Sequence, residues 1–345
     1  MSSRTYAIAW IAATALLFCT VVGINLVLDP QNIYRKGKLD HSPSTNDRYL
    51  RFKNYEAQAD SFDGLLFGSS RGYVIPLDVL SRYCGGVRFA SFAVYGGMVT
   101  DHAPVLEHVL QEKAARGLRL RTVFLLLDVD KIGDRPLTNR VLQYTWPPAI
   151  TGENAARFWW RNLTAIQPEA WKDRWHRASK AVPPATTSVA QRTSFAGLAS
   201  MALIDVSAPV GTSPPNRASP SPFAAPAKPL RRPTQDRYFS EHWTNLERIV
   251  ALCREYDVQL IIAASPLQHV GVANFDEADL ARLVERVSSL APLWDFNSSP
   301  RLADRADLWL DASHFSPEMA KMMLDQIFLG GPEGAENSIG VRCGD

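Results

Sequence analysis

The chain of 345 residues lacks most of the features that mark the simplest functional classes. It has only four cysteines, and no pair has the C-x-x-C spacing of a metal site or redox motif. Its formal net charge of +2 gives no support for nucleic-acid binding. No internal repeat is visible. We therefore expect a globular protein of one large domain or two modest ones, without a metal, a cofactor or a nucleic-acid partner.

The cysteines have no chemical role that their spacing predicts. Cys19 lies in an apolar N-terminal run, which leaves Cys84, Cys253 and Cys343. One disulfide among these three with one free thiol is compatible with the sequence, and so are three free thiols.

Formal charge is absent from Tyr6 to Leu28, a largely apolar run of 23 residues. A helix of this length, at about 1.5 Å per residue, crosses a hydrocarbon core of about 30 Å. The run is longer than the apolar part of a usual signal peptide, and no A-x-A cleavage site follows it. A buried core helix would normally have a polar face. The pattern therefore favours an uncleaved transmembrane signal anchor over residues 1–28.

After a polar connector (29–60), short apolar runs alternate with helical patterns. Strands are expected within 64–68, 87–94, 121–130, 258–266 and 293–297, and helices lie between them. This alternation predicts a parallel sheet covered on both faces, a three-layer α/β/α domain made of residues 61–135 and 236–332.

Two segments interrupt or follow that alternation. Residues 136–205 form a helical insertion with five tryptophans, and residues 206–235 form an extended or disordered loop rich in proline. Residues 333–345 are expected to be a flexible tail. The tryptophans at 159, 160, 171 and 175 allow two interpretations, which are sugar stacking in a groove over the site and packing of helices onto the core.

Polar clusters follow several of the predicted strands. In an open parallel sheet the carboxyl ends of the strands form the ligand-binding edge. Ser70 follows the first strand, and Asp311 and His314 lie three residues apart before the last helix. A serine hydroxyl becomes nucleophilic when an imidazole accepts its proton and a carboxylate orients that imidazole. We therefore predict Ser70 as nucleophile, His314 as base and acid, and Asp311 as the orienting group.

Oxyanion stabilisation would come from backbone N–H groups near the start of a helix. Gly96 is a candidate for one of these donors, because glycine permits close approach of the backbone. A plain turn at Gly96 is an equally good interpretation.

Four motifs together resemble the SGNH/GDSL hydrolase superfamily. They are "FGSSR" after a strand, "ASFAVYGG", a third strand ending "LLLDVD", and a late "DASHF". The apolar helix followed by "DPQNIY", and the pair "LWDFN" and "DASHF", resemble the membrane-anchored bacterial branch that includes alginate O-acetyltransferase-like proteins. The resemblance covers residues 20–130 and 238–330. It implies a flavodoxin-like fold and acyl transfer or ester hydrolysis on a cell-envelope polysaccharide or acyl-sugar.

The resemblance also assigns roles and exposes two departures. Ser70 matches the nucleophile, Gly96 the second-block glycine, and Asp311 with His314 the D-x-x-H pair. Ser69 stands where the family usually has aspartate. Asp130 stands where an asparagine amide usually stabilises the oxyanion, and an ionised carboxylate there would repel that oxyanion. We expect Arg71 to replace the missing donor or to neutralise Asp130, and Tyr95 is a weaker candidate.

The resemblance places the domain in the periplasm, tethered to the inner membrane and its lipid. The basic residues Arg35, Lys36 and Lys38 after the helix instead favour the cytoplasm. The main hypothesis is an acyltransferase or esterase with a membrane-embedded acyl-donor protein as partner. The alternatives are a degenerate SGNH domain that binds glycan or scaffolds an export complex without turnover, and an esterase that acts on lipid.

Overall fold

The computed structural model describes residues 2–34, 45–137, 142–179, 230–297, 299–330 and 341–343. The chain divides into two compact units. The first unit is Met1–Lys53 with Thr138–Thr186, and the second is Asn54–Leu137 with Thr187–Asp345. Most of the predicted proline-rich loop, most of the predicted tail, and the basic residues 35, 36 and 38 lie outside the described residues.

A six-stranded sheet forms the centre of the second unit, in the order β2-β1-β3-β4-β5-β6. The first five of these are parallel to their neighbours, and β6 pairs antiparallel with β5. The predicted α/β class with a parallel sheet is therefore confirmed. The strands are β1 (Gly64–Gly68), β2 (Phe89–Ala93), β3 (Thr122–Leu127), β4 (Gln259–Ala264), β5 (Leu293–Asp295) and β6 (Val341–Cys343).

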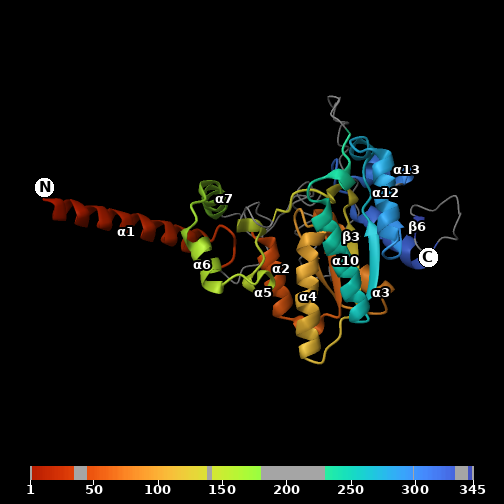
Figure 1. Ribbon diagram of the computed structural model, residues 1–345, viewed down its shortest axis with the longest axis horizontal. Helices are drawn as coiled ribbons and strands as arrows, with labels where there is room; N and C mark the ends of the chain where they lie inside the picture. The colour runs from red at the N-terminus through yellow and green to blue at the C-terminus, as the bar shows by residue number, and fades with distance from the viewer. Residues whose placement is uncertain are drawn as a thin grey trace. The chain divides into compact units, whose positions relative to one another are not determined.

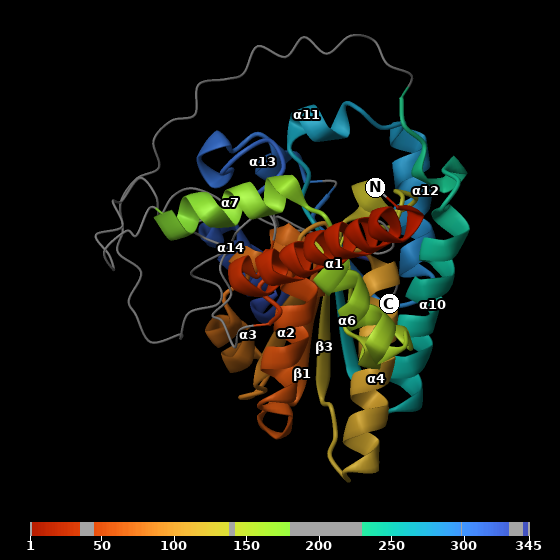
Figure 2. The same ribbon diagram turned by 90° about the vertical axis from the view of Figure 1, so that its left-hand side faces the viewer.

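Helices cover both faces of this sheet (Figure 2). α4 and α10 pack against each other on one side, and α3 and α14 lie on the other. The helices of this unit are α3 (Leu77–Tyr83), α4 (Val99–Ala115), α10 (Phe239–Glu255), α11 (His269–Val272), α12 (Glu277–Ser288), α13 (Pro300–Ala303) and α14 (Pro317–Leu329).

The central strands are almost wholly apolar because both of their faces are buried. Alternate side chains point to opposite faces, so Leu66, Phe124 and Ile261 pack in one cluster with Leu80 of α3 and Met323 of α14. All five residues of β1 and all six of β3 are buried. The polar residues that follow these strands are therefore held on a rigid base.

The first unit combines the predicted anchor, most of the predicted connector and the tryptophan-rich insertion. Its helices are α1 (Ser3–Leu28), α2 (Asp47–Glu56), α5 (Pro148–Thr151), α6 (Ala155–Thr164) and α7 (Pro168–Ser179) (Figure 1). Helix α2 crosses the division between the units, because the first unit ends at Lys53 and the helix ends at Glu56. The connector was expected to be polar and irregular, but the 47–56 segment is helical because it presents Tyr49 and Leu50 to an apolar cluster with Phe158.

Two of the tryptophans in the insertion have packing roles. Trp146 is buried beside the Arg48 guanidinium, and Trp159 packs edge-on against Phe158. These two side chains fit the packing interpretation and not the sugar-stacking one. Trp160 and Trp175 are exposed.

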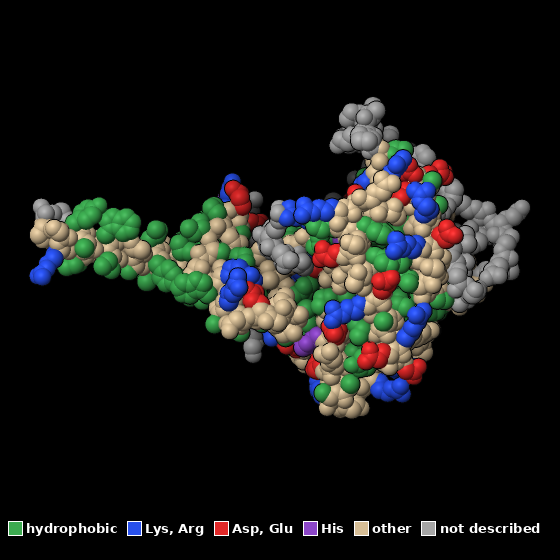
Figure 3. Space-filling model, viewed as in Figure 1, with side chains coloured by type: hydrophobic (Ala, Val, Ile, Leu, Met, Phe, Trp, Pro, Cys, Tyr) green, Lys and Arg blue, Asp and Glu red, His purple; other side chains and the backbone are tan. Residues whose placement is uncertain are grey.

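Among the described residues, α1 is the one helix that is long and apolar enough to cross a membrane. Only 11% of its most apolar 18-residue window is buried. Hydrophobic side chains follow one another along this helix in the space-filling view (Figure 3).

Candidate active site

Ser70 lies at the carboxyl end of β1, where the chain leaves the sheet. A single 3-10 turn, Ser70–Val74, begins directly after the strand, and Ser69 caps it. The Ser69 hydroxyl accepts a hydrogen bond from the Arg71 N–H at 3.2 Å, and the Ser69 carbonyl accepts one from the Gly72 N–H at 2.9 Å. This capped turn fixes the Ser70 backbone at the edge of the sheet. The strand therefore ends at Gly68, and a short polar turn follows it at the edge of the sheet.

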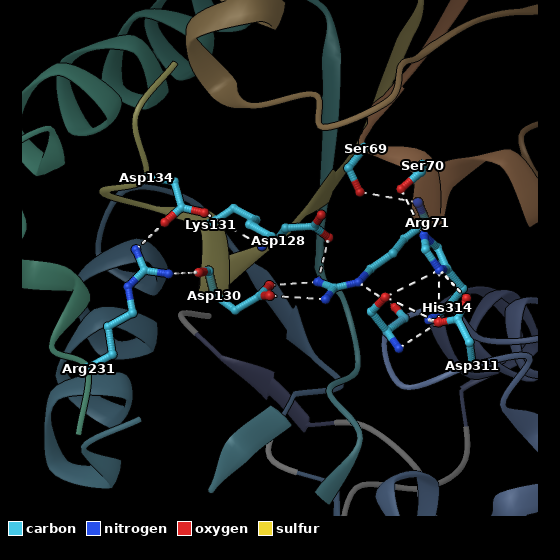
Figure 4. Close-up of polar contacts among 11 residues, drawn as sticks. Ser69, Ser70, Arg71, Asp128, Asp130, Lys131, Asp134, Arg231, Asp311 and His314 are labelled. Carbon is cyan, nitrogen blue, oxygen red and sulfur yellow. Dashed lines mark hydrogen bonds and ion pairs between the residues drawn. The ribbon is translucent and has the colours of Figure 1, made fainter. Parts of the chain in front are cut away.

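His314 comes from the loop before α14 and reaches Ser70 across 244 positions of sequence. The Ser70 Oγ lies 3.0 Å from His314 Nε2. His314 Nδ1 lies 2.8 Å from Asp311 Oδ2 (Figure 4). If Nδ1–H donates to the carboxylate, Nε2 is left as the acceptor for the serine proton. The three predicted triad residues thus form one hydrogen-bonded chain.

The Asp311 carboxylate also shapes the loop that carries His314. Its Oδ1 accepts hydrogen bonds from the backbone N–H groups of Ser313 at 2.8 Å and His314 at 2.9 Å. Burial on its own would raise the pKa of Asp311, but hydrogen bonds from His314 and Ser313 outweigh it and lower that pKa to about 2. Asp311 is therefore an anion at neutral pH, as an orienting carboxylate must be.

Arg71 holds Asp130 in a buried two-pronged ion pair. Its Nη1 lies 2.6 Å from Asp130 Oδ1, and its Nη2 lies 3.0 Å from Asp130 Oδ2. Nη1 also lies 3.2 Å from Asp128 Oδ1, and Nε donates to the Ser313 carbonyl at 2.8 Å. In Figure 4 the Arg71 side chain lies between this acidic pair and the triad.

This arrangement bears on the two roles expected for Arg71. Each of its three guanidinium nitrogens has a partner, and two of them contact Asp130, which is the geometry that the neutralising role requires. Through Ser313, Arg71 also ties the end of β3 to the histidine loop. Arg71 is a positioning residue in this structure.

Two carboxylates share the charge of this one guanidinium. Burial raises the pKa of Asp128, more than Arg71 lowers it. Burial also acts on Asp130, but there the ion pair with Arg71 prevails and the pKa is lowered. Asp130 is thus the ionised partner, and Asp128 retains its proton to higher pH than an ordinary aspartate.

The turn that follows β2 lies beside the end of β1, where the Ser70–Val74 turn begins. Gly96 has a φ of +57°, which favours glycine. A Cβ on Gly96 would lie 2.7 Å from Leu137 Cδ1, and one on Gly97 would lie 2.6 Å from the Gly68 carbonyl oxygen, so both positions favour glycine. Tyr95 is half exposed on the same turn.

Two backbone N–H groups are candidates for an oxyanion site. Within the described part of the chain, the N–H groups of Ser70 and Gly96 have no hydrogen-bond partner. The Gly97 N–H, in contrast, donates to the Val94 carbonyl at 2.9 Å. Ser70 and Gly96 therefore keep donors that a substrate can use.

Sequence reasoning missed the role of Arg231. This residue belongs to the basic "PLRRP" stretch, within the segment 206–235 that was expected to be an extended or disordered loop. Its guanidinium instead donates to the Asp130 carbonyl at 2.9 Å and pairs with Asp134 and Asp236. Arg231 thereby supports the loop after β3, and no local sequence signal links it to residues about 100 positions earlier.

In the described part of the chain, neither the thiols nor the possible metal ligands form a second reactive centre. Cys19, Cys84 and Cys253 are free, and burial raises the pKa of Cys84 to about 11 and that of Cys253 to about 12. Over the described ranges, no group of three or more histidine, cysteine, aspartate or glutamate side chains is arranged to hold a metal ion.

A scan against protein-family models and a search of curated proteins each gave no match. The resemblance to SGNH hydrolases therefore depends on the motif residues alone.

Proposed function

We propose that this protein is a membrane-anchored serine acyltransferase or esterase of the SGNH type, with a flavodoxin-like domain. Its substrates would be O-acyl groups, acetyl above all, of a cell-envelope polysaccharide or acyl-sugar. The observation that carries the proposal is the hydrogen-bonded chain from Ser70 through His314 to Asp311. A serine, an imidazole and a carboxylate in this order are the groups that covalent acyl transfer needs.

In the first half-reaction, Ser70 Oγ attacks the acyl carbonyl carbon while its proton passes to His314 Nε2. The N–H groups of Ser70 and Gly96 are the proposed donors to the oxyanion. Collapse of the tetrahedral intermediate breaks the bond to the leaving alcohol, which takes the proton from His314. The product is an acyl ester on Ser70, with Asp311 stabilising the imidazolium that forms on the way.

In the second half-reaction, His314 Nε2 removes a proton from the acceptor oxygen as that oxygen attacks the carbonyl carbon of the ester. The bond between this carbon and Ser70 Oγ then breaks, and His314 returns the proton to Oγ, which restores the free serine. Water as the acceptor makes the protein an esterase, and a sugar hydroxyl makes it a transferase. The long apolar helix α1 supports work at a membrane surface. On this proposal the α/β domain lies in the periplasm, and an acyl-donor protein lies in the same membrane. The exposure of Asp311, at 46% of its side chain, supports an open site that a polymer can reach.

The rival proposal is a glycan-binding or scaffolding domain without turnover, and Asp130 in the asparagine position is what favours it. The Arg71–Asp130 pair weakens that argument, because the carboxylate is neutralised and turned to Arg71. The Ser70–His314 contact further supports turnover.

Hydrolysis of p-nitrophenyl acetate by the full chain in detergent tests the proposal. We expect turnover that Ser70→Ala and His314→Ala each reduce by a factor of about 10³ or more. Ser288→Ala is the matched control, because it removes a serine hydroxyl on α12 that donates to the Glu285 carbonyl and is not in contact with the three triad residues. A folded parent without turnover would favour the scaffolding alternative, and turnover that survives Ser70→Ala would exclude Ser70 as the nucleophile.

A further inference from the structure

The first unit contains an apolar hollow where the end of α1 meets α7. Its volume is about 630 Å³, within the range of small-molecule sites. The walls come from the last turns of α1 and from one side of α7, and they include Gly23, Ile24, Val27, Trp171, Lys172 and Trp175. Lys172 supplies the one formal charge among the lining residues.

A polar anchor fixes this geometry. Asn25 is fully buried, and its amide donates to the carbonyls of Leu163 at 2.8 Å and Ala165 at 2.9 Å. Its side-chain oxygen accepts the indole N–H of Trp171 at 2.7 Å. A polar side chain on an apolar helix is costly unless its hydrogen bonds are satisfied, and here they are. Trp171 is thus held in place as one wall of the hollow.

The apolar surface of α1 continues onto α6 and α7. Phe18 stacks on Trp160 with ring centroids 5.5 Å apart. Trp160, Ile166 and Trp175 expose between 61% and 67% of their surface. Tryptophan concentrates where a membrane meets water, because its ring is apolar and its N–H is polar. These exposed side chains mark α6 and α7 as helices of that layer.

We propose that the hollow binds an acyl chain of a bilayer phospholipid, with α6 and α7 lying in the headgroup layer and Lys172 on the side of the phosphate. The proposal depends on α1 spanning the membrane and is independent of the chemistry at Ser70. The stretch of α1 that lines the hollow, Thr20 to Leu28, is only about 12 Å long. That length is about the diameter of one helix, so it suits a lipid chain better than the long flank of a second membrane helix.

Gly23 offers a way to fill the hollow without disturbing its walls. A Cβ at this position would meet no atom within 4 Å. Gly23→Trp should therefore occupy the space, and Gly23→Leu should occupy part of it. Ala12→Trp is the matched control, because Ala12 is exposed on α1 away from the hollow.

The full chain would be reconstituted in vesicles of phosphatidylcholine and phosphatidylglycerol that contain a phosphatidylcholine with a diazirine in one acyl chain. Labelled peptides would be mapped by mass spectrometry after illumination. We expect lipid adducts on α7 between Pro168 and His176, a loss of most of these adducts in Gly23→Trp, and an intermediate loss in Gly23→Leu. Adducts on the first half of α1 should persist in all variants, and Ala12→Trp should retain the α7 adducts.

Equal α7 labelling in the parent and in Gly23→Trp would overturn the proposal, as would labelling of α1 without α7. In native membranes, crosslinks from this region to another protein in place of lipid would overturn it in favour of a partner helix. Circular dichroism and a cooperative thermal transition would show that each variant is folded. The labelling pattern is read without any esterase assay, so loss of the acyl-transfer proposal would leave this test unaffected.

Discussion

The Arg71 guanidinium donates two hydrogen bonds to the Asp130 carboxylate, at 2.6 and 3.0 Å, and Arg71 directly follows Ser70, the proposed nucleophile, in the chain. The pair neutralises the aspartate that stands where the proposed resemblance to SGNH hydrolases expects an asparagine. The residue after the serine supplies the charge that neutralises it, and the same guanidinium holds the Ser313 carbonyl of the histidine loop.

Replacing Arg71 by lysine should impair both stability and turnover. Lysine keeps the charge but cannot hold Asp130 and the Ser313 carbonyl at once, so one buried partner is left unsatisfied. We expect a loss of about 3 kcal/mol in the free energy of unfolding and a fall in kcat with little change in KM. Chemical unfolding and steady-state kinetics measure these.

Arg82→Lys is the control for that variant. Arg82 forms an exposed ion pair with Asp78, so we expect a change in the free energy of unfolding below about 0.5 kcal/mol. An Arg71→Lys protein as stable and active as the parent would show that the buried pair does not position the loop.

The raised pKa of Asp128 makes the stability of the protein depend on pH. A carboxyl with a folded pKa above its unfolded value stabilises the fold below about pH 4, and that contribution is lost as pH rises through the folded pKa. Asp128→Asn removes the titration. We therefore expect its free energy of unfolding, relative to the parent, to increase as the pH of urea titrations rises above about 4, and to level off above the folded pKa of Asp128.

Asp78→Asn, at an exposed carboxylate, is the control for the chemical change from aspartate to asparagine. An Asp128→Asn protein whose relative stability is flat or falls with rising pH would contradict the assignment of the proton to Asp128.

Asp311→Asn should reduce kcat by a factor between about 10² and 10⁴, because an amide does not fix the imidazole tautomer or stabilise the imidazolium. Since the pKa of Asp311 is about 2, the parent's carboxylate stays ionised above about pH 4. Its contribution to stability, roughly 1 kcal/mol after solvent screening, is present above about pH 4 and lost as pH falls through 2. Kinetics at pH 7 and unfolding between pH 2 and 5 test the two statements, and a variant with the parent's kcat would remove Asp311 from the mechanism.

Gly97→Ala should disturb the turn beside Ser70. The new Cβ would lie 2.6 Å from the Gly68 carbonyl oxygen and 2.8 Å from Val94 Cγ2. We expect a cost of about 1–3 kcal/mol in the free energy of unfolding and a lower kcat. Gly271→Ala, whose nearest atom would be 3.9 Å away, should change neither. A Gly97→Ala protein with the parent's stability would contradict the close approach.

The five parallel strands were predictable because continuous apolar runs such as Thr122–Leu127 have few alternatives to a buried strand. Strand β6 (Val341–Cys343) was missed, because it lies in the segment expected to be a flexible tail and is defined only by its pairing with β5. The three triad residues were predictable because strand ends and the loop before the last helix meet at one edge. The helix Asp47–Glu56 was missed, since its apolar face is defined only by Phe158 of a distant segment. The sequence left one large domain or two modest ones open. It did not show that residues 1–53 and 138–186 join in one unit, because contacts such as Asn25 with Trp171 link segments 146 positions apart.

The most direct test of the central claim is to trap the acyl-enzyme. The full chain would be mixed with p-nitrophenyl acetate, quenched in acid within one turnover and digested for mass spectrometry. We expect one acetyl group on the peptide that contains Ser70, and none in Ser70→Ala. His314→Ala should accumulate the adduct far more slowly. An acetyl group on another residue, or turnover without any adduct on Ser70, would contradict the account.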